Sequence, residues 1–365
     1  MDRWDLMVIY GSQPYEMVLD LLNEIRPEKG LDQKARIGIK PNLVLARKAE
    51  TGATTHVEIV AGIIDYFKDK GYDNLEILEG SWVGDQTEHA FKICGYETMA
   101  RQRSVPLIDL QKDESRICSV GDMQIRVCQR IFDLDYLINV PVLKGHCQTR
   151  MTCALKNMKG IIPNSEKRRF HAMGLHRPIA LLNHIIRQDL ILVDGLMGDL
   201  NFEEGGHPVP MNRIIAGTDP VLVDSYASAL LGFSIDEIPY IGLSESLSVG
   251  TTDITSARII ALNEAQGQIP VPKPRNLSHY NRLVEERDAC SACYGTLIHA
   301  LERLSEHGTL HRLHRKIYIG QAFKGKELCG IGIGSCALGC TDALPGCPPD
   351  GRAIVDFLES LIDDA

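Results

Sequence analysis

The sequence predicts an α/β fold with a mostly parallel sheet, helices on both faces of that sheet, and a small cysteine-rich α/β segment at the C-terminal end. Two observations support this prediction. Short apolar runs of strand length alternate with stretches of helical spacing from residue 35 onward. Six of the eleven cysteines lie beyond residue 285, where strand-like and helix-like segments also occur.

The first half repeats a strand–helix–strand order, which is typical of parallel sheets. Strands are expected where an apolar run ends at a glycine, proline or asparagine, and helices where apolar residues recur every three or four positions. The expected elements are a strand at 35–39 followed by Lys40-Pro41-Asn42, a helix at 57–70, a strand at 75–78, a short helix closed by Gly95, and strands at 105–108 and 136–140.

The second half continues the pattern with strands at 190–193 and 213–216. Asp219 can cap the following helix and Pro220 suits its first turn, so a helix is expected from there to about Leu231. Three prolines between 267 and 274 predict a linker, followed by a helix near 294–304 and a strand at 316–319. We therefore expect two units, residues 1–265 and 275–365.

The overall composition restricts the functional class. A formal charge of −9 argues against a general nucleic-acid binder. The segment Met1–Asp5 carries acids where a signal peptide needs basic residues, and no apolar run is long enough to span a membrane. We expect a cytoplasmic protein without a membrane partner. Cysteines stay reduced in that compartment, so a cluster of them indicates metal binding or catalysis.

The C-terminal cysteines predict one metal centre. Cys290 and Cys293 form a Cys-x-x-Cys pair, which presents two thiolates from a single turn. Cys347 stands between a glycine and a proline, as in the final ligand of many iron–sulfur runs. Cys336 follows a glycine-rich strand end and is the preferred fourth ligand. Cys329 is expected to be a buried strand residue, whereas the role of Cys340 stays open.

The spacing favours a single 4Fe–4S cluster in residues 275–365. Four-cysteine zinc sites usually use two Cys-x-x-Cys knuckles, and the second half of this segment has none. Structural zinc is the alternative cofactor.

A second group of polar residues follows the strand ends of residues 1–265. Ligands bind at the carboxyl ends of strands in open α/β sheets, so these side chains are expected to line one crevice. Lysines, a histidine and hydroxyl groups in one pocket would favour an anionic small molecule. The catalytic candidates are Lys144, His146 and Lys156; the ligand-binding candidates are Lys40, Asn42, Ser81, Thr152, Asn157 and Asp194. Cys153 is expected to pack on a helix.

The order of several motifs resembles one prokaryotic family, the domain of unknown function 362. The motifs are Lys40-Pro41-Asn42-Leu43, Gly52-Ala53-Thr54-Thr55-His56, Pro141-Val142-Leu143-Lys144-Gly145-His146, Ala154-Leu155-Lys156-Asn157-Met158-Lys159-Gly160, Val193-Asp194-Gly195 and Asp219-Pro220-Val221 with Asp224. The resemblance covers roughly residues 35–235. Members of the family often carry an iron–sulfur segment, so the resemblance implies one here too. It implies no reaction.

We therefore hypothesise an iron–sulfur oxidoreductase or electron-transfer enzyme that acts on an anionic small molecule. No flavin or nicotinamide motif is present, so the expected electron source is a partner protein. One rival is a non-redox enzyme, a dehydratase or sulfur-transfer protein, whose cluster acts as a Lewis acid. The other is a scaffold or sensor stabilised by a cluster or by zinc.

Overall fold

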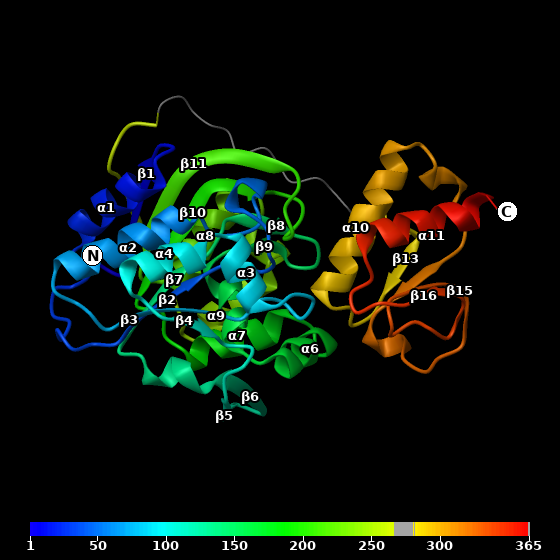
Figure 1. Ribbon diagram of the computed structural model, residues 1–365, viewed down its shortest axis with the longest axis horizontal. Helices are drawn as coiled ribbons and strands as arrows, with labels where there is room; N and C mark the ends of the chain where they lie inside the picture. Colours follow the sequence, from blue (N-terminus) through cyan, green and yellow to red (C-terminus); the bar gives the residue numbers. More distant parts are fainter. Residues whose placement is uncertain (266–279, 281, 364–365) are drawn as a thin grey trace. The chain divides into compact units, whose positions relative to one another are not determined.

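The computed structural model describes residues 1–265, 280 and 282–363, which form two compact units (Figure 1). The first unit contains residues 1–167 and 176–274, and the second contains residues 168–175 and 275–365. The short segment Arg168–Leu175 therefore belongs to the unit built mainly from the C-terminal residues, which the sequence pattern did not predict. The expected proline-rich linker lies outside the described residues.

The first unit is built on an eight-stranded sheet in the order β12-β1-β11-β10-β7-β2-β3-β4. Its strands are β1 (Asp5–Tyr10), β2 (Ile37–Pro41), β3 (Leu75–Glu79), β4 (Leu107–Asp109), β7 (Tyr136–Val140), β10 (Leu190–Asp199), β11 (Pro208–Gly217) and β12 (Arg258–Ala261). Only β11 runs antiparallel to its neighbours β1 and β10, while the other pairs are parallel. The predicted mostly parallel sheet is confirmed.

Helices cover both faces of this sheet, as predicted. Strand side chains alternate between faces: Met7 and Leu192 join one apolar cluster with α1, α2 and α4, while the buried neighbours Val8 and Ile191 face the other way. Helices α5, α7, α8 and α9 contact one another in a second layer. The helices are α1 (Pro14–Ile25), α2 (Val57–Asp69), α3 (Thr87–Ile93), α4 (Tyr96–Arg103), α5 (Ala154–Asn157), α6 (Asn164–Ala172), α7 (His176–Ile185), α8 (Pro220–Leu230) and α9 (Pro239–Ser246).

Local sequence signals explain where α8 begins. Asp219 Oδ1 accepts hydrogen bonds from the backbone N–H groups of Val221 at 2.9 Å and Leu222 at 3.0 Å, and Pro220 occupies the first turn. A side-chain oxygen at this position satisfies N–H groups that have no partner inside the helix. The predicted cap is confirmed.

The structure adds one strand extension and two small hairpins to the elements expected from the sequence. The strand expected at 190–193 continues to Asp199, because it pairs with β11 from Ile191 to Asp199, with one irregularity between Gly195 and Met197. The small hairpins β5 (Ser115–Val120) with β6 (Met123–Cys128) and β8 (Lys144–His146) with β9 (Arg150–Thr152) form separate two-stranded sheets. The β8–β9 hairpin places Lys144 opposite Thr152, so both side chains lie on one face of it.

The second unit has a four-stranded, fully parallel sheet in the order β13-β14-β15-β16. Its elements are β13 (Val284–Glu286), α10 (Ser291–Glu306), β14 (Ile317–Ile319), β15 (Leu328–Ile333), β16 (Cys340–Leu344) and α11 (Gly351–Asp363). Parallel strands direct their carboxyl ends to the same edge. The segments that follow β13, β15 and β16 therefore leave the sheet at one edge.

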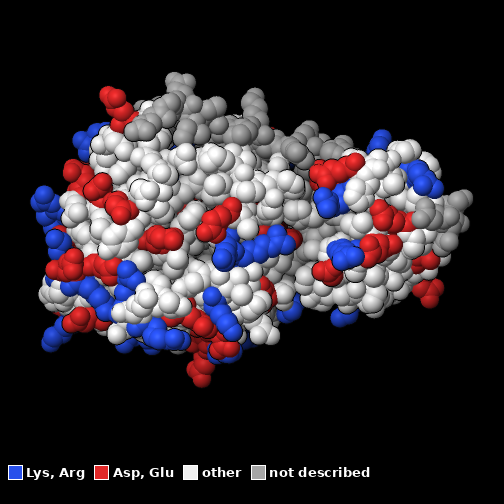
Figure 2. Space-filling model, turned by 45° about the horizontal axis from the view of Figure 1, so that its top comes forward, with Lys and Arg blue, Asp and Glu red and all other residues white. Residues whose placement is uncertain are grey.

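Two surface properties bear on the expected partners. Within the described residues, the structure has no helix that combines the length and the apolar character needed to cross a membrane. On the face drawn in Figure 2, acidic and basic side chains are interspersed rather than separated into regions of one sign.

Candidate functional site

A buried polar network connects neighbouring strand ends in the first unit. Lys40 is the next-to-last residue of β2, and its Nζ lies 3.0 Å from Glu79 Oε2 at the end of β3. Asn157 Oδ1 accepts from Asn42 Nδ2 at 2.8 Å, and its Nδ2 donates to Asn139 Oδ1 at 2.7 Å. Gly160 packs directly against the ion pair, where a Cβ would lie 2.2 Å from Glu79 Oε1. The network fixes α5 against β2 and β7.

Three buried lysines in this region donate to protein oxygens. Lys40 is bound by Glu79, as above. Burial lowers the pKa of Lys144 to about 7 and that of Lys167 to about 8. The acceptors are Asn42 Oδ1, Ala53 O and Glu203 O for Lys144, and Gly80 O, Ser81 O and Asn164 Oδ1 for Lys167. An ammonium group has three N–H donors, so both amines are fully occupied.

Lys156 on α5 differs from these three lysines. Its residue is half-buried, and the described part of the chain offers no hydrogen-bond acceptor to its amine. Burial lowers the pKa of Lys156 to about 8, although the Glu203 carboxylate and the Cys147 thiol oppose this shift. Lys156 is thus the amine with donor positions left for another molecule.

Glu203 connects the residues around Lys156. It is 2 % exposed, and its carboxylate lies 3.2 Å from His146 Nε2. The Cys147 thiol donates to Oε1 at 3.3 Å, and the Cys147 backbone N–H donates to Oε2 at 3.3 Å. One buried carboxylate therefore receives two hydrogen bonds from Cys147 and lies next to the imidazole of His146.

The ligand atoms of His146, Cys147 and Glu203 lie within 4.8 Å of one another, so this group could hold a metal ion. His146 Nδ1 accepts hydrogen bonds from the backbone N–H groups of Gln148 and Thr149, both at 3.1 Å. An accepting Nδ1 places the proton of neutral imidazole on Nε2. Metal-bound histidines usually donate through their second nitrogen. With the proton on Nε2, which lies 3.2 Å from Glu203 Oε1, a metal at this position would have to displace that proton.

Two further polar groups near this hairpin are buried without a hydrogen-bond partner among the described residues: Glu204 Oε1 and Thr152 Oγ1. Glu204 is 4 % exposed, and burial together with the neighbouring Glu203 raises its pKa to about 8. At neutral pH its carboxyl group therefore keeps its proton.

The side chains of Asp194 and Ser81 form hydrogen bonds with other groups of the protein. The Asp194 carboxylate accepts from both the backbone N–H and Nδ1 of His56, each at 2.8 Å. Burial opposes the charged imidazole, but Asp194 outweighs this effect and raises the pKa of His56. Ser81 Oγ donates to the carbonyl of Leu43 at 2.7 Å.

The second unit brings together the four cysteines that the spacing singled out. Cys290 directly precedes α10 and Cys293 lies in its first turn, while Cys336 follows β15 and Cys347 follows β16. Burial raises the pKa of Cys293 to about 12, with further increases from Cys290, Cys347 and Cys336. Burial likewise raises the pKa of Cys336, and Cys347 adds to this. Each of these three cysteines is thus within electrostatic reach of Cys293.

The loops that carry Cys336 and Cys347 are tied to each other. The backbone N–H of Ser335 donates to the carbonyl of Gly346 at 2.8 Å, and Gly346 N–H donates to Ser335 Oγ at 3.2 Å. A Cβ at Gly334 would lie 3.6 Å from Cys293 Sγ, so this loop passes directly beside α10. Gly346 has a φ of +140° and would bring a Cβ within 2.4 Å of Pro349.

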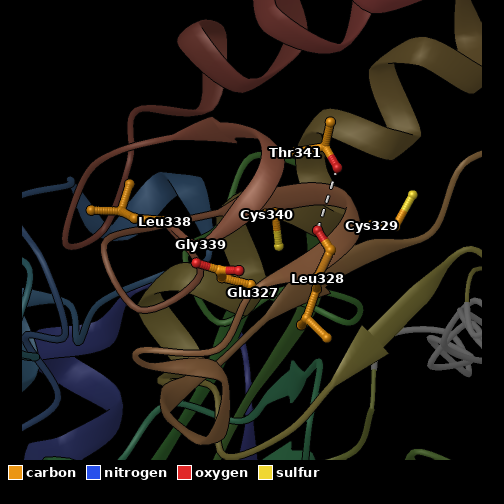
Figure 3. Close-up of a pocket in the computed structure, with 7 residues that line it drawn as sticks. All are labelled: Glu327, Leu328, Cys329, Leu338, Gly339, Cys340 and Thr341. Atoms are coloured by element: carbon orange, nitrogen blue, oxygen red, sulfur yellow. Dashed lines mark hydrogen bonds between the residues drawn. The ribbon is translucent and has the colours of Figure 1, made fainter.

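The remaining two cysteines of this unit lie elsewhere. Cys340 is 8 % exposed and packs with Phe323 and Ala337. Cys329 lies in β15 as expected, but its side chain is exposed rather than buried. Figure 3 shows both beside a shallow hollow of about 460 Å³. The prediction that Cys329 is buried was wrong, because β15 reaches the unit's surface at this end.

Comparison with known proteins identifies the family. Residues 37–229 match the family described as "Domain of unknown function (DUF362)". The chain belongs to this family. The match ends before the cysteine-rich unit, so the family assignment concerns the α/β core.

One relative is a thylakoid-associated protein of Synechocystis sp., 23 % identical over 255 residues that cover 66 % of this chain and 79 % of the relative. Among solved structures, the lactate racemase apoprotein of Thermoanaerobacterium thermosaccharolyticum superposes with a TM-score of 0.43 at 12 % identity. A protein of Thermotoga maritima gives 0.40 at 15 % identity. Each covers 65 % of this chain, and the matched regions are 58 % and 60 % of those two proteins.

Sequence reasoning did not anticipate the acidic partners in the core. Glu203 and Glu204 precede a glycine pair, Gly205-Gly206, and Gly205 has a φ of +73° beside Thr51 O. Two acidic residues followed by two glycines, close to a predicted strand, are a pattern that could have indicated a functional loop. Cationic residues alone predicted the anion site, and its acidic partners carry no such signal of charge complementarity to an anion.

Proposed function

We propose that this protein binds one 4Fe–4S cluster through Cys290, Cys293, Cys336 and Cys347 and transfers electrons in a reaction on an anionic small molecule. The observation that supports this most is the convergence of four thiols from three separate segments at one edge of a parallel sheet. A redox partner protein would supply the electrons.

The chemistry of the four thiols fits a cluster. Burial, and secondly the mutual repulsion of the four groups, raises the pKa of Cys293 and so disfavours its thiolate form. Iron ions would compensate these charges, since metal coordination deprotonates a thiol. The N-terminal end of α10, a helix of 16 residues, also favours negative charge on Cys290 and Cys293. When bound, such a cluster supplies single-electron redox chemistry.

The spacing of the cysteines along the sequence supports iron–sulfur over zinc. Four-cysteine zinc sites usually use two Cys-x-x-Cys knuckles. Cys290 and Cys293 form one such pair, but Cys336 and Cys347 are too far apart in the sequence to form a second.

The first unit offers the site for the small molecule. Its candidate is the region around Lys156, His146 and Thr152, because the other lysines are occupied by protein oxygens. Lys156 keeps donor positions, and Thr152 Oγ1 is a buried hydroxyl without a described partner. These groups would orient an anionic ligand.

Single Cys→Ser variants test the ligand set. The Cys290→Ser, Cys293→Ser and Cys347→Ser variants should each lose most of the iron and acid-labile sulfide after anaerobic purification. The Cys329→Ser and Cys340→Ser variants should keep both. Cys336→Ser separates redox from Lewis-acid chemistry, because a retained cluster would indicate only three cysteine ligands and an open iron. Equal loss in all six variants, or zinc without sulfide in the wild type, would contradict the proposal.

A further inference from the structure

Part of the cysteine site in the second unit reaches the protein surface. Cys290 is buried and Cys336 is half-buried, but Cys347 is exposed. The loop that carries Cys336 also presents Leu338, which is 52 % exposed and lies two positions beyond the cysteine. A protein that docks on this surface therefore comes close to two of the four thiols.

Gln321 holds Arg168 beside the cysteine site. Its Nε2 donates to the Arg168 carbonyl at 3.1 Å and to Cys290 Sγ at 3.8 Å. The Arg168 residue is exposed, and its guanidinium group interacts electrostatically with the Cys336 thiol. The positive charge of Arg168 therefore lies at the surface next to the cysteines.

Two lysines, Lys324 and Lys326, follow Phe323 and are both exposed. Phe323 is buried and packs with Ala337, the residue directly after Cys336. Lys326 Nζ lies 6.0 Å from the centroid of the Phe323 ring, and Lys324 interacts electrostatically with the Cys336 thiol. Both lysines therefore belong to the surroundings of the loop that carries Cys336.

The charges of these three residues are not neutralised by the protein. Other basic side chains of this unit are paired, Arg287 with Glu285 at 2.7 Å and Arg315 with Asp342. One exposed acid, Glu327, follows the lysines, so the local charge stays positive. The three cations without an ion-pair partner among the described residues are here called the basic rim: Arg168, Lys324 and Lys326.

We propose that the basic rim and Leu338 form the docking surface for a small acidic one-electron carrier protein of the ferredoxin type. This inference rests on the proposed function, because it names the partner that would deliver electrons to the cluster. One electron passes from the reduced carrier to the oxidised cluster, while no bond forms or breaks and no proton moves.

The chemistry of the surface fits such a partner. Complementary charge steers two proteins toward each other, and an acidic carrier needs a local positive region on a chain whose formal charge is −9. Electron-transfer complexes bury small areas, so a few exposed cations around one apolar side chain are sufficient. The position beside the thiols favours an electron carrier over nucleic acid, for which the overall charge is unfavourable.

Binding of the full-length, anaerobically purified chain to an oxidised plant-type ferredoxin tests the proposal. Biolayer interferometry measures the affinity at low and at high salt, with a single-stranded oligonucleotide as the counter-probe. Ferredoxin affinity should fall about 10-fold between about 20 and about 200 mM salt, because screening weakens the attraction. No ferredoxin binding at low salt, or tighter binding of the oligonucleotide, would overturn the proposal.

Charge variants locate the surface. Lys324→Glu combined with Lys326→Glu should weaken ferredoxin binding at low salt on the order of 10- to 100-fold. Arg303→Glu, the same change at an exposed position far along α10, should alter it less than about twofold. Glu327→Gln removes the acid beside the lysines and should strengthen binding about twofold, a gain that misfolding cannot produce. Unchanged binding in the double variant, or weaker binding in Glu327→Gln, would contradict the docking surface.

Iron and sulfide analysis of the same sample separates this inference from the proposed function. A chain that holds about four irons but does not bind ferredoxin would disprove the docking surface alone. Zinc without sulfide would contradict the proposed cluster, whatever the binding result.

Discussion

Asn157 joins the ends of two strands, β2 and β7, through a single side chain. Its amide accepts from Asn42 and Lys40 and donates to Asn139 and Pro41 O, all of them buried. A buried charge is costly unless its hydrogen-bonding groups are satisfied, so this amide supports the Lys40–Glu79 ion pair by accepting from Lys40 Nζ. The residue is therefore more important for holding the site together than for touching a ligand.

Replacing Asn157 by alanine should destabilise the protein by about 2–4 kcal/mol, because several buried donors and acceptors lose their partner at once. Chemical denaturation of the purified variant measures this. Asn23→Ala, at an exposed position on α1, should change stability by less than about 0.5 kcal/mol. Equal effects at both positions would show that the network contributes little.

Glu204 gives stability a specific pH dependence. Burial and Glu203 raise its pKa from 4.5 to about 8, so between these values the folded state holds a proton that the unfolded state has lost. Stability then falls as pH rises through this window. Compared with wild type, Glu204→Gln should gain relative stability from pH 4.5 to 8 and show a constant difference above that. A difference that does not change with pH would contradict the protonated carboxyl group.

Three elements form the cysteine site: the N-terminal turn of α10, the loop after β15 and the loop after β16. Gln321 Nε2 bridges the Arg168 carbonyl at 3.1 Å and Cys290 Sγ at 3.8 Å. The segment Arg168–Leu175 thus takes part in the surroundings of the cysteines. Arg168 and Lys324 also place positive charge near Cys336, where both favour the thiolate.

If the proposed cluster binds here, these charges should raise its reduction potential. An extra electron is stabilised by nearby positive charge, so Arg168→Gln should lower the midpoint potential by on the order of tens of millivolts. A redox titration followed by electron paramagnetic resonance measures the shift. Arg303→Gln is the matched control, because Arg303 lies ten residues beyond Cys293 on α10, about 15 Å along the helix. The same shift in both variants would argue against a local effect.

Elements with strong periodicity could be predicted from the sequence, and the others could not. The α2 and α10 helices and the strands β2, β3 and β7 have continuous apolar patterns and were expected close to their observed positions. The β5–β6 hairpin is largely exposed and carries no such pattern. The extension of β10 to Asp199 depends on pairing with β11, a tertiary contact that no local signal contains.

In the candidate sites too, some features could be predicted from the sequence and others could not. Cysteine spacing was sufficient to select four residues that the fold brings together, although their role as ligands stays a prediction. Strand ends were sufficient to predict that Lys40, Asn42 and Asn157 meet. The sequence did not show that Glu79 binds Lys40 or that Glu203 collects donors, because these contacts join segments separated by 39 to 59 residues.

The two proposed functions lie in different units of the chain. The family match over residues 37–229 covers the Lys156 region, while the cysteine site belongs to residues beyond it. Electron transfer and small-molecule binding are therefore assigned to different parts of the chain and can be tested one at a time.

The most direct test of the central claim is electron paramagnetic resonance of the anaerobically purified wild-type protein before and after dithionite, together with iron and sulfide analysis. The account predicts about four irons and four sulfides per chain and a signal that appears on reduction, as expected of a 4Fe–4S centre. Zinc without sulfide, and no signal in either state, would contradict it and leave the cysteines as a structural metal site.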